Sequence, residues 1–109
     1  MSTPVNQLPD LPCYLNGEFT ALRDAKISVM DRGFIFGDAV YEAVPVYGGN
    51  PFRFAQHMVR LDRSLTELRI ANPLTHAQWH EITIKLIADY ARSAGVNVSS
   101  TTSNARPTE

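Results

Sequence analysis

The sequence predicts an α+β domain, in which short strands come first along the chain and helices follow. An Asn16-Gly17 pair marks a tight hairpin, because both central positions of a type I′ turn need a positive φ. Residues 39–47 are rich in Val and Tyr, which is typical of a strand. After residue 54 the apolar period changes from two to about 3.6, which indicates helices. We expect a small antiparallel sheet with two helices packed on one of its faces.

Length and composition bound the class of protein. The 109 residues suffice for one domain with a modest core, and 44% hydrophobic with 19% charged residues is a globular composition. The formal net charge is −1 with dispersed Lys and Arg, which argues against a nucleic-acid partner. No apolar stretch is long enough for a membrane span. The single cysteine, Cys13, excludes an internal disulfide and favours a reducing, cytoplasmic location.

Three parts of the chain differ in composition. Residues 1–12 contain three prolines, which oppose regular structure, so we expect a flexible lead. Residues 13–98 carry the periodic patterns and are expected to form the domain. Residues 99–109 are almost entirely polar, with many Ser and Thr, and we expect them to be a disordered tail.

Short extended elements and turns are expected before the helices. They are a hairpin at 13–20, an extended piece at 24–29, a turn or single helical turn at 31–37, the strongest strand at 39–47, a turn at 48–50 and a returning strand at 51–54. Pro45 lies inside the strongest strand, which favours an edge position or a bulge. We expect Asp31 and Arg32 to form a salt bridge in the turn.

Two helices are expected in the second half. The first runs from about residue 55 to residue 70, and Asn72-Pro73 ends it. Its apolar stripe consists of Met58, Leu61, Leu65 and Leu68. Thr75 and Gln78 form a capping box at the start of the second helix. The buried face of that helix is expected to carry Trp79, Ile82, Leu86 and Tyr90, with Gly95 as its end.

The most informative stretch is 31–42, where a charged, glycine-bearing turn leads into the strand and to Tyr41 and Glu42. Burying a phenol and a carboxylate is costly unless they find partners, so the stretch favours a site over a plain core. Alternation along a strand places Tyr41 and Glu42 on opposite faces, so they should do different jobs. On the first helix, His57 and Arg60 share one face at a spacing of three residues.

Four blocks of sequence carry a family resemblance. They are Tyr14-Leu15-Asn16-Gly17, the run from Asp31-Arg32-Gly33-Phe34 to Val40-Tyr41-Glu42, Val46-Tyr47-Gly48-Gly49, and Phe52 followed by His57 and Arg60-Leu61. In this order they resemble the N-terminal domain of the class IV, or fold-type IV, aminotransferases, which use pyridoxal phosphate (PLP). Val40-Tyr41-Glu42 is most similar to the D-amino acid (D-alanine) aminotransferases. Branched-chain aminotransferases and aminodeoxychorismate lyases are similar and remain alternatives.

The resemblance implies roles for single residues. Arg60 matches the arginine that holds the PLP phosphate, and a guanidinium fork suits a phosphate. Tyr41 matches the tyrosine that contacts the substrate carboxylate. Glu42 and His57 match positions that support these two residues without touching the ligand. The alternatives are a solvated helix arginine at 60 and a buried strand tyrosine with a satisfied hydroxyl at 41.

The resemblance also implies what this chain lacks. A lysine on the second domain of the family forms the Schiff base with PLP, and Lys26 and Lys85, the only lysines here, match no such motif. We therefore expect a truncated form that is inactive alone, with a non-catalytic fragment or partner subunit as alternatives. Intact family members act on an amino acid and a 2-oxo acid and are homodimers.

Two further positions allow a check. Ala39 stands where the family motif commonly has a second glycine, and a positive φ there would cost on the order of 1 kcal/mol. His76 and His80, four residues apart, could together contact a metal ion. Zinc sites need three or four ligands, however, and the sequence offers no third candidate nearby, so we expect no metal site.

Overall fold

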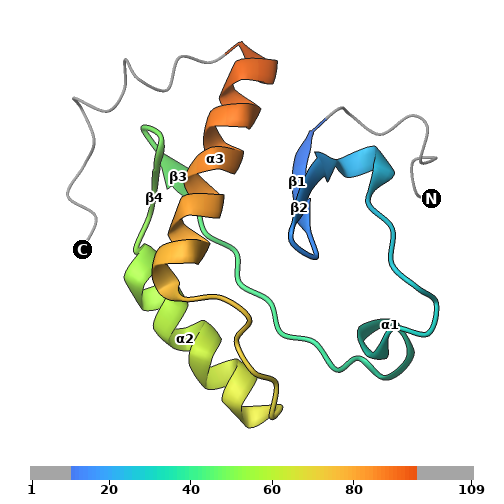
Figure 1. Cartoon of the computed structure of the whole chain (residues 1–109). Helices are drawn as coiled ribbons and strands as arrows, with labels where there is room; N and C mark the ends of the chain where they lie inside the picture. The colour runs from blue at the N-terminus through green and yellow to red at the C-terminus, as the bar shows by residue number, and fades with distance from the viewer. Residues whose placement is uncertain (1–10, 96–109) are drawn as a thin grey trace.

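The computed structural model describes residues 11–95, so the expected tail and most of the expected lead lie outside the described residues. The elements are β1 (Pro12–Leu15), β2 (Glu18–Ala21), a 3-10 turn (Leu22–Asp24), α1 (Arg32–Phe36), β3 (Val46–Tyr47), β4 (Asn50–Pro51), α2 (Phe54–Glu67) and α3 (His76–Ala94) (Figure 1). The predicted α+β class is confirmed.

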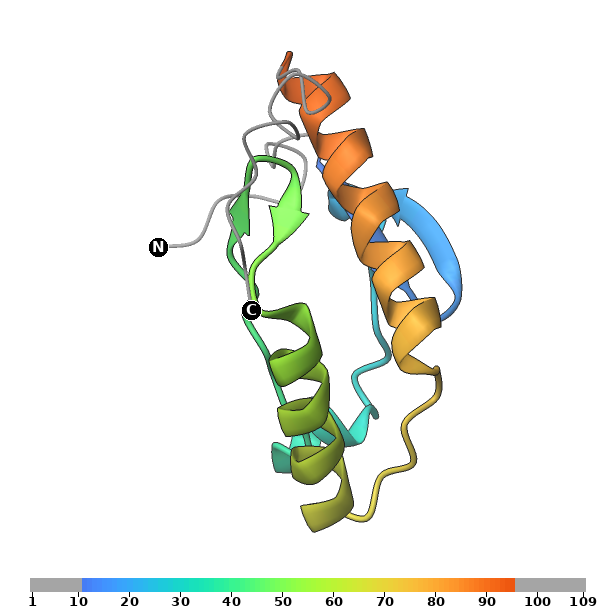
Figure 2. The same cartoon turned by 90° about the vertical axis from the view of Figure 1, so that its left-hand side faces the viewer.

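Helix α3 occupies the middle of the described structure. The β1–β2 hairpin packs on one side of α3, the β3–β4 hairpin lies on the other, and α2 also contacts α3 (Figures 1 and 2). Both hairpins are antiparallel, and they do not pair with each other. The expected antiparallel sheet is therefore present as two separate two-stranded pieces.

The first hairpin forms as its turn sequence predicts. Strands β1 and β2 pair with Leu15 opposite Glu18, and Asn16 and Gly17 have φ values of 51° and 89°. These positive values are what a type I′ turn requires. The ring of Phe19 projects from this hairpin toward α3, where the Nζ of Lys85 lies 4.8 Å from its centroid.

The strand expected at 39–47 is mostly absent, and only its last two residues form β3. Residues 40–44 make no backbone hydrogen bond with another described residue, and a strand exists only where a partner accepts and donates such bonds. Their burial still alternates with period two, with Val40, Glu42 and Val44 half-buried and the residues between them exposed. The extended piece expected at 24–29 pairs with no strand of the described residues; Asp24 ends the 3-10 turn, and the residues after it are irregular.

The turn at 31–37 is confirmed as a single helical turn, α1. The backbone N–H of Gly33 donates to Oδ2 of Asp31 at 2.9 Å, which caps the helix start. Gly37 ends it with a φ of 71°, a left-handed conformation that glycine adopts without strain.

The salt bridge expected between Asp31 and Arg32 is wrong. Asp31 is engaged as a cap, and Arg32 instead pairs with Asp38, whose Oδ2 lies 2.7 Å from its Nη2. Adjacent side chains in a helical start diverge, whereas a loop can return residue 38 to residue 32. Ala39 is not among the non-glycine residues with positive φ, so its replacement of glycine costs nothing there.

Helix α2 begins earlier than expected, at Phe54, so the returning strand is only Asn50–Pro51. Within the predicted apolar stripe, Met58 and Leu65 are buried, with 5% and 7% of their surface exposed. Leu61 is half-buried, and Leu68, just past the helix end, is exposed. The stripe is thus confirmed over the helix and wrong at its last member.

The capping box of α3 is confirmed in both directions. The backbone N–H of Gln78 donates to Oγ1 of Thr75 at 3.1 Å, and the backbone N–H of Thr75 donates to Oε1 of Gln78 at 2.9 Å. Gly95 closes the helix at a φ of 75°. On the predicted face, Trp79, Ile82 and Leu86 are half-buried. Tyr90 is exposed, because it borders an open groove rather than a packed element.

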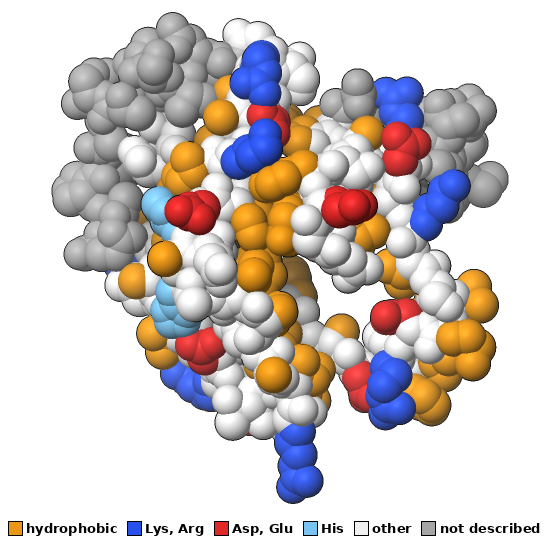
Figure 3. All heavy atoms as spheres, viewed as in Figure 1, with side chains coloured by type: hydrophobic (Ala, Val, Ile, Leu, Met, Phe, Trp, Pro, Cys, Tyr) orange, Lys and Arg blue, Asp and Glu red, His pale blue; other side chains and the backbone are white. Residues whose placement is uncertain are grey.

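Few side chains of the described residues are fully buried. The buried apolar residues are Pro51, Met58, Leu65 and Ala91. Apolar side chains are exposed around α1, which lies apart from α2 and α3 (Figures 1 and 3). We call this set the α1 patch; it consists of Ile27, Val29, Met30, Phe34, Ile35 and Phe36. Contiguous apolar surface of this kind is typical of an interaction site.

Candidate functional site

Three polar side chains meet where the irregular segment 38–45 comes against α2. Glu42 belongs to the segment, whereas His57 and Arg60 lie one turn apart on the helix. Nε of Arg60 donates to Oε2 of Glu42 at 2.8 Å, and Nη2 donates to Oε1 at 2.9 Å. Nδ1 of His57 lies 2.6 Å from the same Oε1. We call these three residues the Glu42 cluster.

The carboxylate of Glu42 is enclosed by its partners, with 10% of the side chain exposed. Hydrogen bonds from Arg60 first, and then from His57, lower its pKa from 4.5 to about 2, although desolvation acts in the opposite direction. The hydrogen bonds to Glu42 likewise raise the pKa of Arg60 above its ordinary value. Both groups are therefore charged, and their two-point contact is the strong form of carboxylate–guanidinium bonding.

The ionised carboxylate determines which nitrogen of His57 carries the proton. A carboxylate only accepts hydrogen bonds, so we assign the hydrogen to Nδ1, which donates it to Oε1 of Glu42. Nη2 of Arg60 lies 3.4 Å from Nδ1, and two donors do not bond to each other. His57 therefore supports the carboxylate from a second direction.

Arg60 keeps one edge of its guanidinium open. The group has five N–H donors, and Glu42 accepts from Nε and Nη2. Nη1 makes no hydrogen bond within residues 11–95, and 57% of the side chain is exposed. The Nη1–Nη2 edge can therefore receive a second anion that presents two oxygens, such as a phosphate.

Tyr41 lies outside the cluster. Its side chain makes no hydrogen bond within the described residues, and 85% of its surface is exposed. The alternative of a buried strand tyrosine is therefore wrong, because no described element covers this side of the segment. The predicted opposition of neighbours is confirmed, since Glu42 points inward and Tyr41 outward.

The structure thus brings Glu42, His57 and Arg60 together and leaves Tyr41 apart. The shared face of His57 and Arg60 follows from helical spacing and could be predicted. The direct contact of Arg60 with Glu42 was missed, because the two residues are 18 positions apart and belong to different elements. The sequence did hold one indication of this contact, since one motif block carries the negative Glu42 and the other carries the positive Arg60.

A second polar network joins α2 to α3, and sequence reasoning missed it. Oδ1 of Asp62 accepts from Asn72 at 2.8 Å, and its Oδ2 lies 2.6 Å from Nε2 of His76. These bonds, with Asn72 first, lower the pKa of Asp62. Oδ1 of Asn72 accepts from Nε1 of Trp79 at 2.8 Å. The network holds the loop between the two helices. In the sequence, the Asn72-Pro73 turn was the one feature that could have indicated a polar contact at this loop.

The two histidines considered for a metal face different partners. His76 lies against Asp62, and the ring of His80 lies 5.0 Å from that of Phe54, edge to face. Within the part of the chain that the structure describes, no three His, Cys, Asp or Glu side chains are grouped so that they could hold a metal ion.

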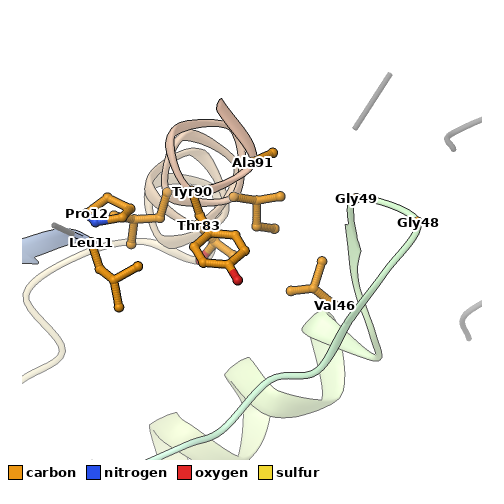
Figure 4. A pocket seen from close by; sticks show the side chains of 10 residues that line it. Leu11, Pro12, Val46, Gly48, Gly49, Thr83, Tyr90 and Ala91 are labelled. Atoms are coloured by element: carbon orange, nitrogen blue, oxygen red, sulfur yellow. The ribbon is translucent and has the colours of Figure 1, made fainter. Parts of the chain in front are cut away.

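An apolar groove of about 550 Å³ lies on α3 between the two hairpins (Figure 4). Leu11 borders it beside the first hairpin, Val46 beside the second, and Leu86 and Tyr90 on the helix. Among residues 11–95, no charged side chain lines the groove, and the groove shares no residue with the Glu42 cluster. A phosphate would find no cation there, so the cluster is the better candidate for an anionic ligand.

Comparison with known families identifies the class of protein. The family described as amino-transferase class IV matches residues 39–107, which is more than half of the chain. The match includes all three residues of the Glu42 cluster. The chain belongs to the class IV aminotransferase family.

Individual relatives carry more specific names. The D-alanine aminotransferase of Staphylococcus aureus (strain N315) is 38% identical over 74 residues, which cover 68% of this chain and 26% of that protein. A putative branched-chain-amino-acid aminotransferase of Methanocaldococcus jannaschii has the same identity and coverage. The D-alanine aminotransferase of Staphylococcus haemolyticus is 40% identical over 57 residues, or 52% of this chain and 20% of that protein.

The predicted resemblance to the class IV aminotransferases of the D-alanine type is confirmed by these matches. The chain spans about a quarter of the length of the curated relatives that it matches. None of the helices within residues 11–95 is both long enough and apolar enough to cross a bilayer.

Proposed function

We propose that this chain supplies the phosphate-holding part of a PLP-dependent aminotransferase that transfers amino groups between D-amino acids and 2-oxo acids. The observation that carries the proposal is the guanidinium of Arg60, which Glu42 fixes along one edge and which is open along the other. Family membership and the names of two relatives support the same reading.

The donor set fits the phosphate of PLP. A phosphate offers several acceptor oxygens, and the free edge of Arg60 offers parallel N–H donors for two of them. The charges of Glu42 and Arg60 offset each other, so directed hydrogen bonds from the free edge of Arg60 would provide the recognition. When bound, PLP supplies an electron sink for chemistry at the α-carbon of an amino acid.

Tyr41 is the proposed contact for the substrate carboxylate. Its phenol is a neutral donor and is open to solvent, so a carboxylate can reach it without displacing an internal hydrogen bond. Glu42, next to it in sequence, faces the opposite way. We propose that Arg60 and Tyr41 bind, and that Glu42 and His57 hold the binding groups in place.

The lysines of this chain are not at the cluster. Nζ of Lys85 donates to Oδ2 of Asp89 at 3.0 Å, and Lys26 is exposed on an irregular segment. Neither makes a hydrogen bond or ion pair with the Glu42 cluster. We propose that the chain on its own binds the phosphate but does not transaminate, since the reaction needs a lysine held at the coenzyme.

The decisive experiment measures binding of pyridoxine 5′-phosphate to the full chain by calorimetry. This probe has the phosphate but no aldehyde, so it cannot react with lysines. Arg60→Leu should weaken binding about 10- to 100-fold, because a hydrogen-bonded charge is lost. Arg63→Leu removes an exposed arginine of the same helix and should leave binding unchanged. Equal binding by both variants would remove the proposal.

A branched-chain substrate is the alternative, because the Methanocaldococcus jannaschii relative is as similar as the Staphylococcus aureus relative. Two stable probes separate the readings: N-(5′-phosphopyridoxyl)-D-alanine and its L-leucine counterpart. Tighter binding of the D-alanine probe supports the D-amino acid reading. The reverse order supports the branched-chain reading.

We also propose that the α1 patch associates with a second copy of the chain, as a homodimer. The patch carries six large apolar side chains in ten residues, and burial in an interface would remove them from water. Sedimentation velocity should show a dimer that Phe34→Glu converts to monomer. A monomeric wild-type chain at high concentration would contradict this proposal.

We propose a cytoplasmic location as well. The single Cys13 fits a reducing compartment, and cell fractionation would test this location.

A further inference from the structure

The segment that carries Tyr41 has an unusual mode of attachment. Residues 40–44 make no backbone hydrogen bonds within the described part of the chain, and Tyr41 has no side-chain partner there. Glu42 makes all the hydrogen bonds that these five residues have with described residues, and all of them end on α2. The polar attachment of the segment to the helix therefore depends on one carboxylate.

From this arrangement we propose that Glu42 is a positioning residue for both halves of the site at once. Through its oxygens it orients Arg60 toward the phosphate, and through its backbone it holds the neighbouring Tyr41 outward for the substrate. This inference rests on the proposed function. It adds that phosphate binding and the placement of Tyr41 are coupled through a residue that touches neither ligand.

The effect on Arg60 is a balance of two opposing terms. Fixing the plane of a flexible guanidinium in advance should improve phosphate affinity about tenfold, because side-chain freedom is lost before binding. The carboxylate of Glu42 also repels the negative phosphate, which opposes binding, but water at the exposed guanidinium screens this repulsion. Arg60 is more than half exposed, so screening is strong and orientation outweighs repulsion.

The effect on Tyr41 follows from geometry along the segment. Adjacent side chains of an extended chain point in opposite directions, so an inward Glu42 places Tyr41 outward. Val40 and Val44 are half-buried on the same side as Glu42, but apolar contacts fix no direction as hydrogen bonds do. Loss of the carboxylate should therefore release the segment while α2 keeps its place through Met58 and Leu65.

His57 makes the arrangement more rigid. Its Nδ1 donates to Oε1 of Glu42, and Nη2 of Arg60 donates to the same oxygen. One oxygen of Glu42 therefore accepts two hydrogen bonds. The carboxylate plane is then defined by three donors: Nε and Nη2 of Arg60 and Nδ1 of His57. Glu42→Gln keeps the size of the side chain but presents an amide N–H₂ to these donors, which breaks the pattern.

The test compares Glu42→Gln with Glu67→Gln, the same change at an exposed position of α2. With pyridoxine 5′-phosphate and the full chain, Glu42→Gln should weaken binding about three- to tenfold, and Glu67→Gln should not change it. Equal or tighter binding by Glu42→Gln would overturn the inference. Arg60→Leu separates the two proposals: if it binds normally, the proposed function itself fails.

A second measurement reads the coupling without any ligand. The heteronuclear ¹⁵N NOE of the Tyr41 amide should be that of an ordered backbone in the wild type and should fall in Glu42→Gln. The Nε–H resonance of Arg60 should shift in the same variant, and both should stay unchanged in Glu67→Gln. An unchanged Tyr41 amide would refute the coupling. If circular dichroism shows Glu42→Gln unfolded, Glu42→Asp replaces it, with about threefold weaker binding expected and unchanged binding as refutation.

Discussion

Acid should remove a defined part of the stability of the wild-type chain, and Glu42→Gln should abolish that part. The hydrogen bonds from Arg60 and His57 lower the pKa of Glu42 from 4.5 to about 2. A shift of that size corresponds to at most about 3.5 kcal/mol, since each pKa unit is about 1.4 kcal/mol. Solvent screening at the exposed Arg60 reduces the expected contribution to about 1–2 kcal/mol.

The sign follows from the direction of the shift. A carboxyl group whose pKa is lower in the folded state stabilises the fold above its unfolded pKa, because the unfolded chain takes up protons first. The contribution of Glu42 is therefore complete above about pH 5 and is lost as the pH falls toward 2. Asp62 and Asp89 also have lowered pKa values, so acid weakens the wild type through them as well.

Urea unfolding followed by circular dichroism, at pH values from 6 to 2.5, measures this contribution. The difference in free energy of unfolding between wild type and Glu42→Gln should be about 1–2 kcal/mol at pH 6 and should shrink as the pH falls. Taking the difference cancels the effects of Asp62 and Asp89, which both proteins share. A difference that stays constant over this pH range would refute the reasoning.

Three further outcomes are expected in urea unfolding at neutral pH, each followed by circular dichroism. Thr75→Ala removes the cap of α3 and should cost about 1 kcal/mol, whereas Thr66→Ala in the last turn of α2 should cost less. Met58→Ala removes one of the few buried side chains and should cost about 2–3 kcal/mol; a cost below 1 kcal/mol would contradict its core position. Trp79→Phe deletes the hydrogen bond to Asn72 and should cost about 1 kcal/mol, and an unchanged midpoint would show that the bond contributes nothing.

The elements that sequence reasoning predicted well are those set by local signals. The Asn16-Gly17 turn and the capping box of Thr75 each involve residues within four positions of each other, so a short stretch of sequence determines their geometry. The helical stripe of Met58 and Leu65 is likewise local, because its period is a property of one helix.

The elements that were missed depend on distant partners. The β-rich composition of 39–47 predicted a strand, but a strand needs a neighbour, and none of the described residues pairs with 40–44. The contact of Glu42 with Arg60 joins two elements, and nothing in either motif alone reveals it. The resemblance supplied the residues of the site, and only the three-dimensional arrangement supplied their mutual contacts.

The backbone of residues 40–44, which makes no hydrogen bonds with described residues, also affects solubility. Their N–H and C=O groups pair with no described residue, and such groups in an extended segment can form hydrogen bonds with any other extended chain, which makes this stretch a hazard for aggregation. Pro45 limits the hazard, because it has no N–H and its carbonyl already accepts from Phe52 at 2.8 Å. Self-association by this route would be confined to these five residues. Val44→Pro removes one more backbone N–H donor from them and should therefore improve solubility.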